Sequence, residues 1–262
     1  RETTTESPTA APGDLLLEHI VSPAPTTERL QSIQRMVADQ LGDALPRPSL
    51  PWLWGAYWSA SVQKPGNTTD GYLLHKRDSK AGDVRVYTPG VRLRRAFERW
   101  DTGAEGAYQF GDVGARSVRA WAWHADASYK LNRKGTAMIE ANEASGGDPT
   151  GTGRYRTFDQ LYPTNHDKYG IMDNQGWRNM RNLRAGLRYA PAPGWSFGAD
   201  IHSFRLQNAR DYWYGASGRP NVGPSGVLLR DPTGAAGKDV GRELDIYGRR
   251  ALSKTASVEG GY

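Results

Sequence analysis

The chain has 262 residues and a formal net charge of +6, since 34 Lys and Arg stand against 28 Asp and Glu. Hydrophobic residues make up only 37% of it, and no stretch approaches the ~20 consecutive apolar residues of a membrane-spanning helix, which excludes helical membrane proteins. The absence of cysteine excludes disulfide scaffolds, Cys-based zinc sites and cysteine nucleophiles.

The first 48 residues differ from the rest of the sequence. Thr and Pro dominate residues 1–12, which we expect to form a loop. One amphipathic helix is predicted at about 28–41, where apolar residues recur at helical spacing. We therefore place a domain boundary after this segment and assign residues 49–262 to a β-rich domain.

From Trp52 onward the hydrophobic period changes from 3.6 to 2. Trp52, Trp54 and Trp58 share one face of the first segment, whereas Gly55 and Ser59 lie on the other. The same alternation recurs at 100–111, 117–131, 179–189, 195–203 and near the end of the chain, and less cleanly at 69–77, 83–97 and 135–145. The pattern predicts about ten strands.

These predicted strands are too long for an ordinary soluble sheet. Globular strands average about 5 to 6 residues, whereas a tilted membrane strand needs roughly 9 to 11, with apolar residues outside, polar residues inside and aromatic residues at both ends. We therefore predict an all-β fold, a transmembrane antiparallel β-barrel of the porin-like, outer-membrane type. The tryptophans then indicate a membrane aromatic girdle rather than a sugar-stacking surface.

The connections alternate between short and long. Short turns such as 132–134 and 191–193 contrast with the long gaps 146–178 and 208–238, which fall on the same side of the alternation. Since outer-membrane barrels have short periplasmic turns and long extracellular loops, the final segment at 251–262 is predicted to ascend from the periplasm. We expect a further strand to follow it, so the chain represents part of a barrel.

Several stretches resemble the alginate-export family of bacterial outer-membrane barrels. They are ASGGDP at 144–149, TFDQLYPTNHDKYG at 157–170 and MDNQGWRN at 172–179, with further similarity in GAYQFG at 106–111 and VGRELD at 240–245. The resemblance extends from about Trp54 to Tyr262 and implies an outer-membrane channel. The export protein that names this family passes an anionic polyuronate through an Arg-rich lumen, whereas many relatives have no known substrate.

Basic side chains on the polar faces are the candidate substrate contacts. If these faces line a lumen, the basic residues form a cationic track whose guanidinium groups suit carboxylates; they are Arg92, Arg94, Lys130, Arg184 and Arg188. The alternative is that acidic residues on the same surface pair with them across strands. The acidic residues are Glu105, Asp126, Glu140, Asp200, Glu243 and Asp245.

Two histidines on the polar faces are assigned to the same lumen lining. His124 precedes Asp126 and His202 follows Asp200 at two-residue spacing, a pattern open to a base with its orienting carboxylate. No nucleophile or metalloprotease motif accompanies these pairs, so we predict lumenal hydrogen bonding, no catalytic residue, no enzyme activity and no cofactor.

The gap at 146–178 contains four aspartates among Gly, Asn and Thr. Calcium is conceivable from such oxygen ligands, but the spacing is not that of an EF-hand, and we assign no metal site. We expect the loop to fold over or into the mouth of the barrel and constrain passage. Its predicted anchors are Phe158, Leu161, Tyr162 and Tyr169.

Together these features predict an outer-membrane channel for passive passage or export of anionic polysaccharide or small anionic solutes. The expected partners are the lipid bilayer with its lipopolysaccharide, an anionic polysaccharide and an envelope protein assembly. No basic cluster suits nucleic acid. The alternatives are a structural scaffold barrel in an envelope assembly and a soluble periplasmic β-rich carbohydrate-binding protein, whose tryptophan-bearing faces would be buried in a dry core.

Overall fold

The computed structural model describes residues 51–61, 66–79, 82–163, 169–253 and 256–262. The predicted N-terminal loop and the helix at about 28–41 lie outside these residues. All strands belong to the unit Leu50–Tyr262, and the domain boundary placed after residue 48 stays a prediction. In the described part of the chain, no helix is long and apolar enough to cross a membrane.

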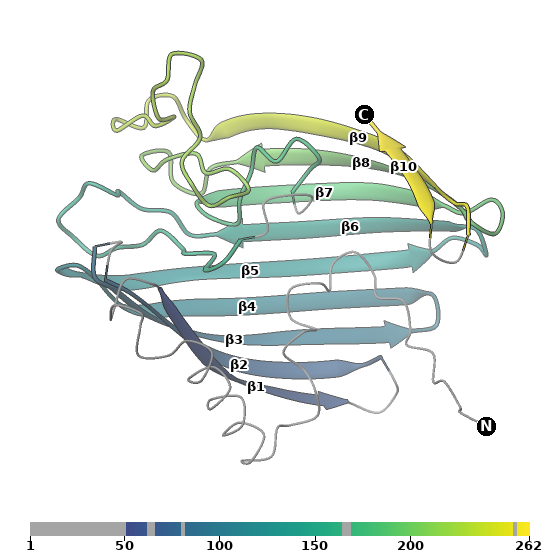
Figure 1. The fold of residues 1–262 in the computed structure, drawn as a ribbon, viewed down its shortest axis with the longest axis horizontal. Helices are drawn as coiled ribbons and strands as arrows, with labels where there is room; N and C mark the ends of the chain where they lie inside the picture. The colour runs from purple at the N-terminus through teal and green to yellow at the C-terminus, as the bar shows by residue number, and fades with distance from the viewer. Residues whose placement is uncertain (1–50, 62–65, 80–81, 164–168, 254–255) are drawn as a thin grey trace, which may run out of the picture. The chain divides into compact units, whose positions relative to one another are not determined.

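In the described ranges, ten antiparallel strands form one sheet in which each strand pairs with its neighbours in sequence (Figure 1). They are β1 Trp52–Ser61, β2 Thr68–Asp78, β3 Val84–Phe97, β4 Trp100–Val113, β5 Arg116–Lys130, β6 Gly135–Ala144, β7 Met180–Tyr189, β8 Trp195–Arg205, β9 Asp239–Ala251 and β10 Ser257–Gly261. The all-β prediction and the predicted number of strands are confirmed. This sequential order is that of an up-and-down barrel wall.

The two faces of the sheet differ in polarity, as the alternation predicted. In β7 the side chains of Leu183 and Leu187 are exposed on one face, while Asn182 is buried on the other. Most strand tryptophans lie on the exposed apolar face, where Trp52 and Trp58 are 66% and 60% exposed. Trp177 and Trp213 instead belong to the long loops, and Trp177 packs against the inner-face core. Large apolar groups exposed along a whole face fit contact with lipid, because a soluble fold would bury them.

Aromatic side chains gather near both ends of this apolar face. Trp100 contacts Tyr129 at one end with ring centroids 4.7 Å apart, and Tyr87 stacks on Phe110 towards the other end at 5.4 Å. Trp100 and Phe110 both belong to β4. The rise of ten strand residues is about 34 Å, or about 26 Å across the bilayer at a tilt of about 40°, which matches an apolar band of ~25 Å between two girdles.

Both long connections leave the same end of the sheet (Figure 1). They are loop 145–179, between β6 and β7, and loop 206–238, between β8 and β9. The turns 131–134 and 190–194 lie at the opposite end. Short turns mark the periplasmic end of an outer-membrane barrel, so the two long loops are extracellular.

A small apolar core lies on the inner face near the extracellular end. Its members are Val84, Val86, Ala107, Val118, Ala120, Ala122, Ala144, Phe158 and Met180. All but Phe158 come from strands, and the alanines of β4 to β6 leave space in which Phe158 of loop 145–179 is buried. Tyr169 also packs against this core, whereas Tyr162 stays 43% exposed. The loop therefore folds inward over the inner face.

Candidate functional site

Strand register arranges the inner-face side chains in rows that cross the sheet. The row at the extracellular end of β6 and β7 contains Gly90, Ala107, Ala122, Ala144 and Met180. Two polar rows follow; one contains Arg92, Glu105, His124, Asn142 and Asn182, and the next contains Arg94, Gly103, Asp126, Glu140, Arg184 and His202. Residues that are far apart in the sequence thus become direct neighbours.

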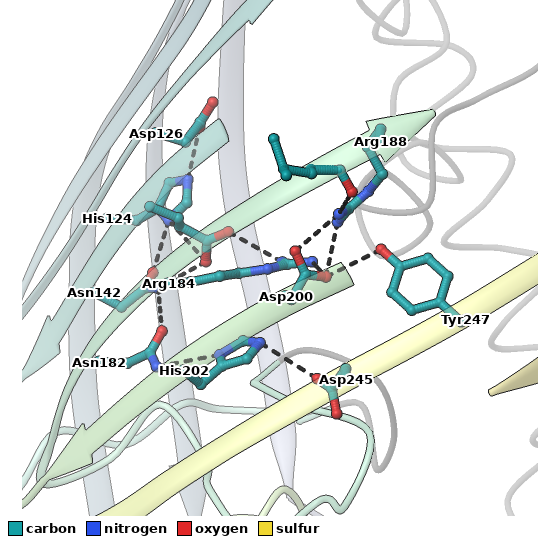
Figure 2. A network of polar contacts seen from close by, with 12 residues as sticks. His124, Asp126, Asn142, Asn182, Arg184, Arg188, Asp200, His202, Asp245 and Tyr247 are labelled. Atoms are coloured by element: carbon teal, nitrogen blue, oxygen red, sulfur yellow. Dashed lines mark hydrogen bonds and ion pairs between the residues drawn. The ribbon is translucent and has the colours of Figure 1, made fainter. Parts of the chain in front are cut away.

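Asp200 is the centre of the polar network on this face (Figure 2). Its carboxylate accepts hydrogen bonds from Arg184 Nη2 at 2.7 Å, from Arg188 Nη1 and Nη2 at 2.8 and 2.9 Å, and from the Tyr247 hydroxyl at 3.0 Å. Two carboxylate oxygens offer about four acceptor positions, so these four donors saturate the group. The predicted pair Arg184 and Arg188 is therefore brought together by one buried acid.

A chain of polar contacts continues from this centre towards β5. Arg184 Nη1 donates to Glu140 Oε2 at 3.3 Å. His124 lies between two partners, with Nδ1 2.7 Å from Asn142 Oδ1 and Nε2 2.8 Å from Asp126 Oδ1. His124 and Asp126, which the two-residue spacing placed on the same face, are therefore in contact in the structure.

The second histidine has different partners from those its spacing suggested. His202 Nε2 lies 3.5 Å from Asp245 Oδ2, and its Nδ1 lies 3.3 Å from Asn182 Nδ2. Asp200, two residues earlier, is occupied by arginines and a tyrosine instead. Because His202 is buried between strands, its surroundings suit a structural hydrogen-bonding role on the inner face.

The remaining predicted cations occupy separate positions. Arg94 Nη2 donates to Asp101 Oδ1 at 2.9 Å. Arg92 lies opposite Glu105 in the register of β3 and β4, and Glu105 accepts a hydrogen bond from Tyr72 at 2.6 Å. Lys130 is exposed at the periplasmic end, in a row with Thr136, Arg188, Gly198 and Tyr247. The five basic residues thus lie on one face but do not form a continuous unpaired track.

The alternative interpretation predicted that Glu243 pairs with a basic residue across strands, but among the described residues no arginine forms an ion pair with it. Its Oε1 accepts a hydrogen bond from the backbone N–H of Met172 at 2.8 Å. Met172 belongs to loop 145–179, so this strand residue of β9 holds the returning part of the loop against the inner face. The contact ties the loop to the far side of the sheet from Phe158.

Buried polar groups join the two long loops to each other. Asp211 accepts hydrogen bonds from Gly147 N at 2.8 Å, from the Thr157 hydroxyl at 2.5 Å and from the Tyr214 hydroxyl at 2.9 Å. Asn179 Nδ2 donates to the backbone oxygen of Tyr212 at 2.9 Å. Burial, followed by the nearby Asp211 carboxylate, raises the pKa of the Tyr214 hydroxyl. These satisfied contacts order the loops as one extracellular unit.

Two of the described loop aspartates pair with cations on different elements. Asp148 pairs with Arg230 at 2.8 Å, and Asp159 pairs with Lys76 at 2.7 Å. Among the described residues, no three His, Asp or Glu side chains are grouped so that they could hold a metal ion. These two carboxylates form ion pairs that connect loop 145–179 to loop 206–238 and to strand β2.

Three residues of the network were absent from the sequence prediction. Asn142 and Asn182 connect the two histidines, since Asn142 Nδ2 donates to Asn182 Oδ1 at 3.2 Å, and Tyr247 completes the shell of Asp200. Each lies two residues from a predicted charged residue of its own strand, and therefore on the same face: Asn142 from Glu140, Asn182 from Arg184 and Tyr247 from Asp245. This two-residue spacing was the available signal, but neutral side chains on a polar face are too common for the spacing alone to identify them.

The comparison with protein families agrees with the resemblance found in the sequence. The family model described as alginate export matches residues 52–262. A solved structure of the NanC porin in a rhombohedral crystal form is similar, with 11% sequence identity and a TM-score of 0.35. The match covers 78% of this chain and 76% of the porin chain. A search of curated proteins returned no match. The family match begins at the first residue of β1 and includes every strand of the sheet.

Proposed function

Because the chain belongs to the alginate export family and is an outer-membrane β-barrel channel, we propose that it passes anionic polysaccharide or small anionic solutes without covalent chemistry. The outer-membrane location excludes the soluble carbohydrate-binding alternative. That alternative also required a dry core for the tryptophan-bearing strand faces, whereas Trp52, Trp54, Trp58, Trp100, Trp123 and Trp195 are exposed on the apolar face.

One observation carries the proposal, namely the difference in exposure between the acids and the bases of the inner face. The Asp200 side chain is 2% exposed, whereas those of Arg184 and Arg188 are 20% and 32% exposed. The carboxylate lies beneath the two guanidinium groups, so a passing solute contacts the cations first. Planar guanidinium groups bind carboxylates through paired N–H donors, which favours polyuronates and other carboxylated solutes.

Arg188 offers a direct test in planar bilayers. Arg188→Gln removes an exposed lumenal guanidinium but leaves Asp200 with Arg184 and Tyr247 as donors. We expect the ratio of anion to cation permeability, measured from reversal potentials in a salt gradient, to fall. Block by an acidic uronate oligomer should weaken with it.

The control for this test lies in the same strand. Arg181 is on the exposed face of β7 and pairs with Glu143 at 2.6 Å, so Arg181→Gln removes an equal charge outside the lumen. Its selectivity should match that of the unmodified protein. A cation-selective unmodified channel, or equal selectivity of Arg188→Gln and Arg181→Gln, would contradict the proposal.

The contacts of loop 145–179 favour a second candidate, a scaffold barrel with a filled lumen. Phe158 is buried against strands β3 to β7, and Glu243 of β9 holds Met172. A loop fixed on both sides of the inner face can close the passage rather than narrow it. A protein that inserts into bilayers but conducts no ions, in either polarity, would support this candidate.

A further inference from the structure

A cavity of about 400 Å³ lies at the periplasmic end of the inner face. Its lining includes Lys130, Arg133, Lys134, Thr136, Arg188 and Tyr247. Four of these belong to the last row that register makes across β5 to β9, and two belong to the turn between β5 and β6. The cavity therefore lies where a solute from the periplasm first meets the barrel.

The charge of this cavity differs from that of the rows above it. Its lining holds four basic residues and no Asp or Glu. Within the described ranges, no carboxylate forms an ion pair with Lys130, Arg133 or Lys134. Arg188 shares Asp200 with Arg184, so one acid serves two cations at the inner end of the cavity. The local charge is thus positive, whereas acids and bases alternate in the polar rows.

The turn that carries two of the cations is held by its own asparagine. Asn132 Oδ1 accepts hydrogen bonds from the backbone N–H groups of Lys134 and Gly135 at 2.8 and 2.9 Å. The Lys134 backbone oxygen also accepts a hydrogen bond from Ala190 N, in the next turn, at 2.8 Å. An asparagine that closes a turn in this way leaves the intervening side chains outside the hydrogen bonding. The turn is therefore held through its backbone, and the charged groups of Arg133 and Lys134 take no part in holding it.

Tyr247 and Arg188 form a fixed surface on the inner side of the cavity (Figure 2). The Arg188 guanidinium lies 5.1 Å from the Tyr247 ring centroid, and both side chains donate to Asp200. A Cβ at Gly198 would lie 2.4 Å from Tyr247 Cζ, so glycine is needed for the ring to occupy this place. An aromatic ring with a guanidinium group held in place is suited to an acidic sugar, because it needs little reorganisation on binding.

From these features we propose that the cavity is a capture site for acidic sugar units at the periplasmic mouth, which borders the Asp200 network and shares Arg188 and Tyr247 with it. The ligand class rests on the proposed function. Unpaired cations at a mouth raise the local concentration of an anionic ligand and its rate of association. Arg133 and Lys134 then attract the polymer, and Arg188 with Lys130 binds the carboxylate of the unit that enters.

The test compares two double variants of the full chain in detergent. Arg133→Gln with Lys134→Gln removes two cavity charges and keeps Asn132, so the turn should remain folded. The matched control is Arg154→Gln with Arg156→Gln, which removes two exposed charges from the extracellular loop 145–179. The probe is a tetramer of uronic acid, followed by titration calorimetry, with maltotetraose as its neutral counterpart.

We expect the cavity variant to bind the uronate about tenfold more weakly at low ionic strength, and this difference to shrink in high salt. The control should bind like the unmodified protein, and maltotetraose should bind none of them measurably. Equal affinity of all three proteins for the uronate, or no binding by the unmodified protein, would overturn the proposal. Displacement by inorganic phosphate as efficient as that by uronate would overturn the acidic-sugar assignment.

Sided block of single channels separates this proposal from the channel function. Uronate added on the periplasmic side should block less often in the cavity variant, whereas block from the extracellular side should be unchanged. Equal loss from both sides would contradict a periplasmic site. If the unmodified protein binds uronate through Arg133 and Lys134 but conducts nothing, the capture site stands and the proposed passage fails.

Discussion

Asp200→Asn should separate the structural role of the buried carboxylate from its effect on lumenal charge. The unmodified side chain accepts hydrogen bonds from Arg184, Arg188 and Tyr247 and is 2% exposed. An asparagine keeps one acceptor oxygen but turns an NH₂ group towards a guanidinium. Arg188 then loses its acidic partner, and Arg184 keeps only Glu140.

The expected cost follows from this burial. Removing one partner of a buried ion pair costs about 3 to 5 kcal/mol when the remaining charge is left without compensation. Because Arg184 keeps Glu140 and Arg188 is 32% exposed, we expect the lower end of this range, about 3 kcal/mol. The control is Asp101→Asn, which makes the same change at the Arg94 pair, where the two side chains are 39% and 45% exposed. An exposed pair of this kind contributes about 1 kcal/mol or less.

Two assays on the same proteins check the reasoning. Urea unfolding in lipid vesicles should show a large loss of stability for Asp200→Asn and a small one for Asp101→Asn. Reversal potentials should shift towards anions in both variants, since each adds one positive charge to the inner face. A similar loss of stability in the two variants, or a shift towards cations in Asp200→Asn, would refute the argument.

Three further predictions concern the loops and the lipid face. In Gly146→Ala the new Cβ would lie 1.8 Å from Asn179 Oδ1, so the Asn179 side chain should move. Limited proteolysis should then cleave loop 145–179 faster than in the unmodified protein. The control is Gly151→Ala, where the atom closest to the new Cβ is 3.4 Å away and the cleavage rate should not change. Leu183→Arg should lower the free energy of unfolding in vesicles by about 2 to 4 kcal/mol, because it places a charge on the lipid-facing side of the sheet, where Leu183 is exposed. Leu228→Arg, in loop 206–238, should leave the free energy of unfolding nearly unchanged. The hydroxyl of Thr233, followed by the Ala236 and Thr233 N–H groups, lowers the pKa of Asp231 to about 2. The protection of these amides against hydrogen exchange should therefore be complete above pH ~4, the unfolded pKa, and be lost as the pH falls towards 2. Asp231→Asn should abolish that pH dependence, and protection that instead declines near neutral pH would refute the assignment.

The sequence alone determined the strands, their faces and the ends at which the loops lie. Alternation with a period of two is a local property of an extended chain, so Leu183 and Leu187 can be assigned to one face without knowing any partner strand. Loop length and turn chemistry are equally local, and they separated loop 145–179 from turn 131–134. For the same reason, the basic and acidic residues could be assigned to a common surface before the structure was known.

Pairing between residues of different strands was decided only by the tertiary structure. Asp200 and Arg188 meet because register places them in adjacent rows, and Tyr247 joins them from β9 over a glycine. The choice of Asp245 rather than Asp200 as the neighbour of His202, and the use of Glu243 to hold a loop, depend on the same register. A one-residue shift in register would exchange the faces and separate these groups. Parity therefore settles which residues face the lumen, whereas long-range register and loop packing settle which of their charges remain available to a solute.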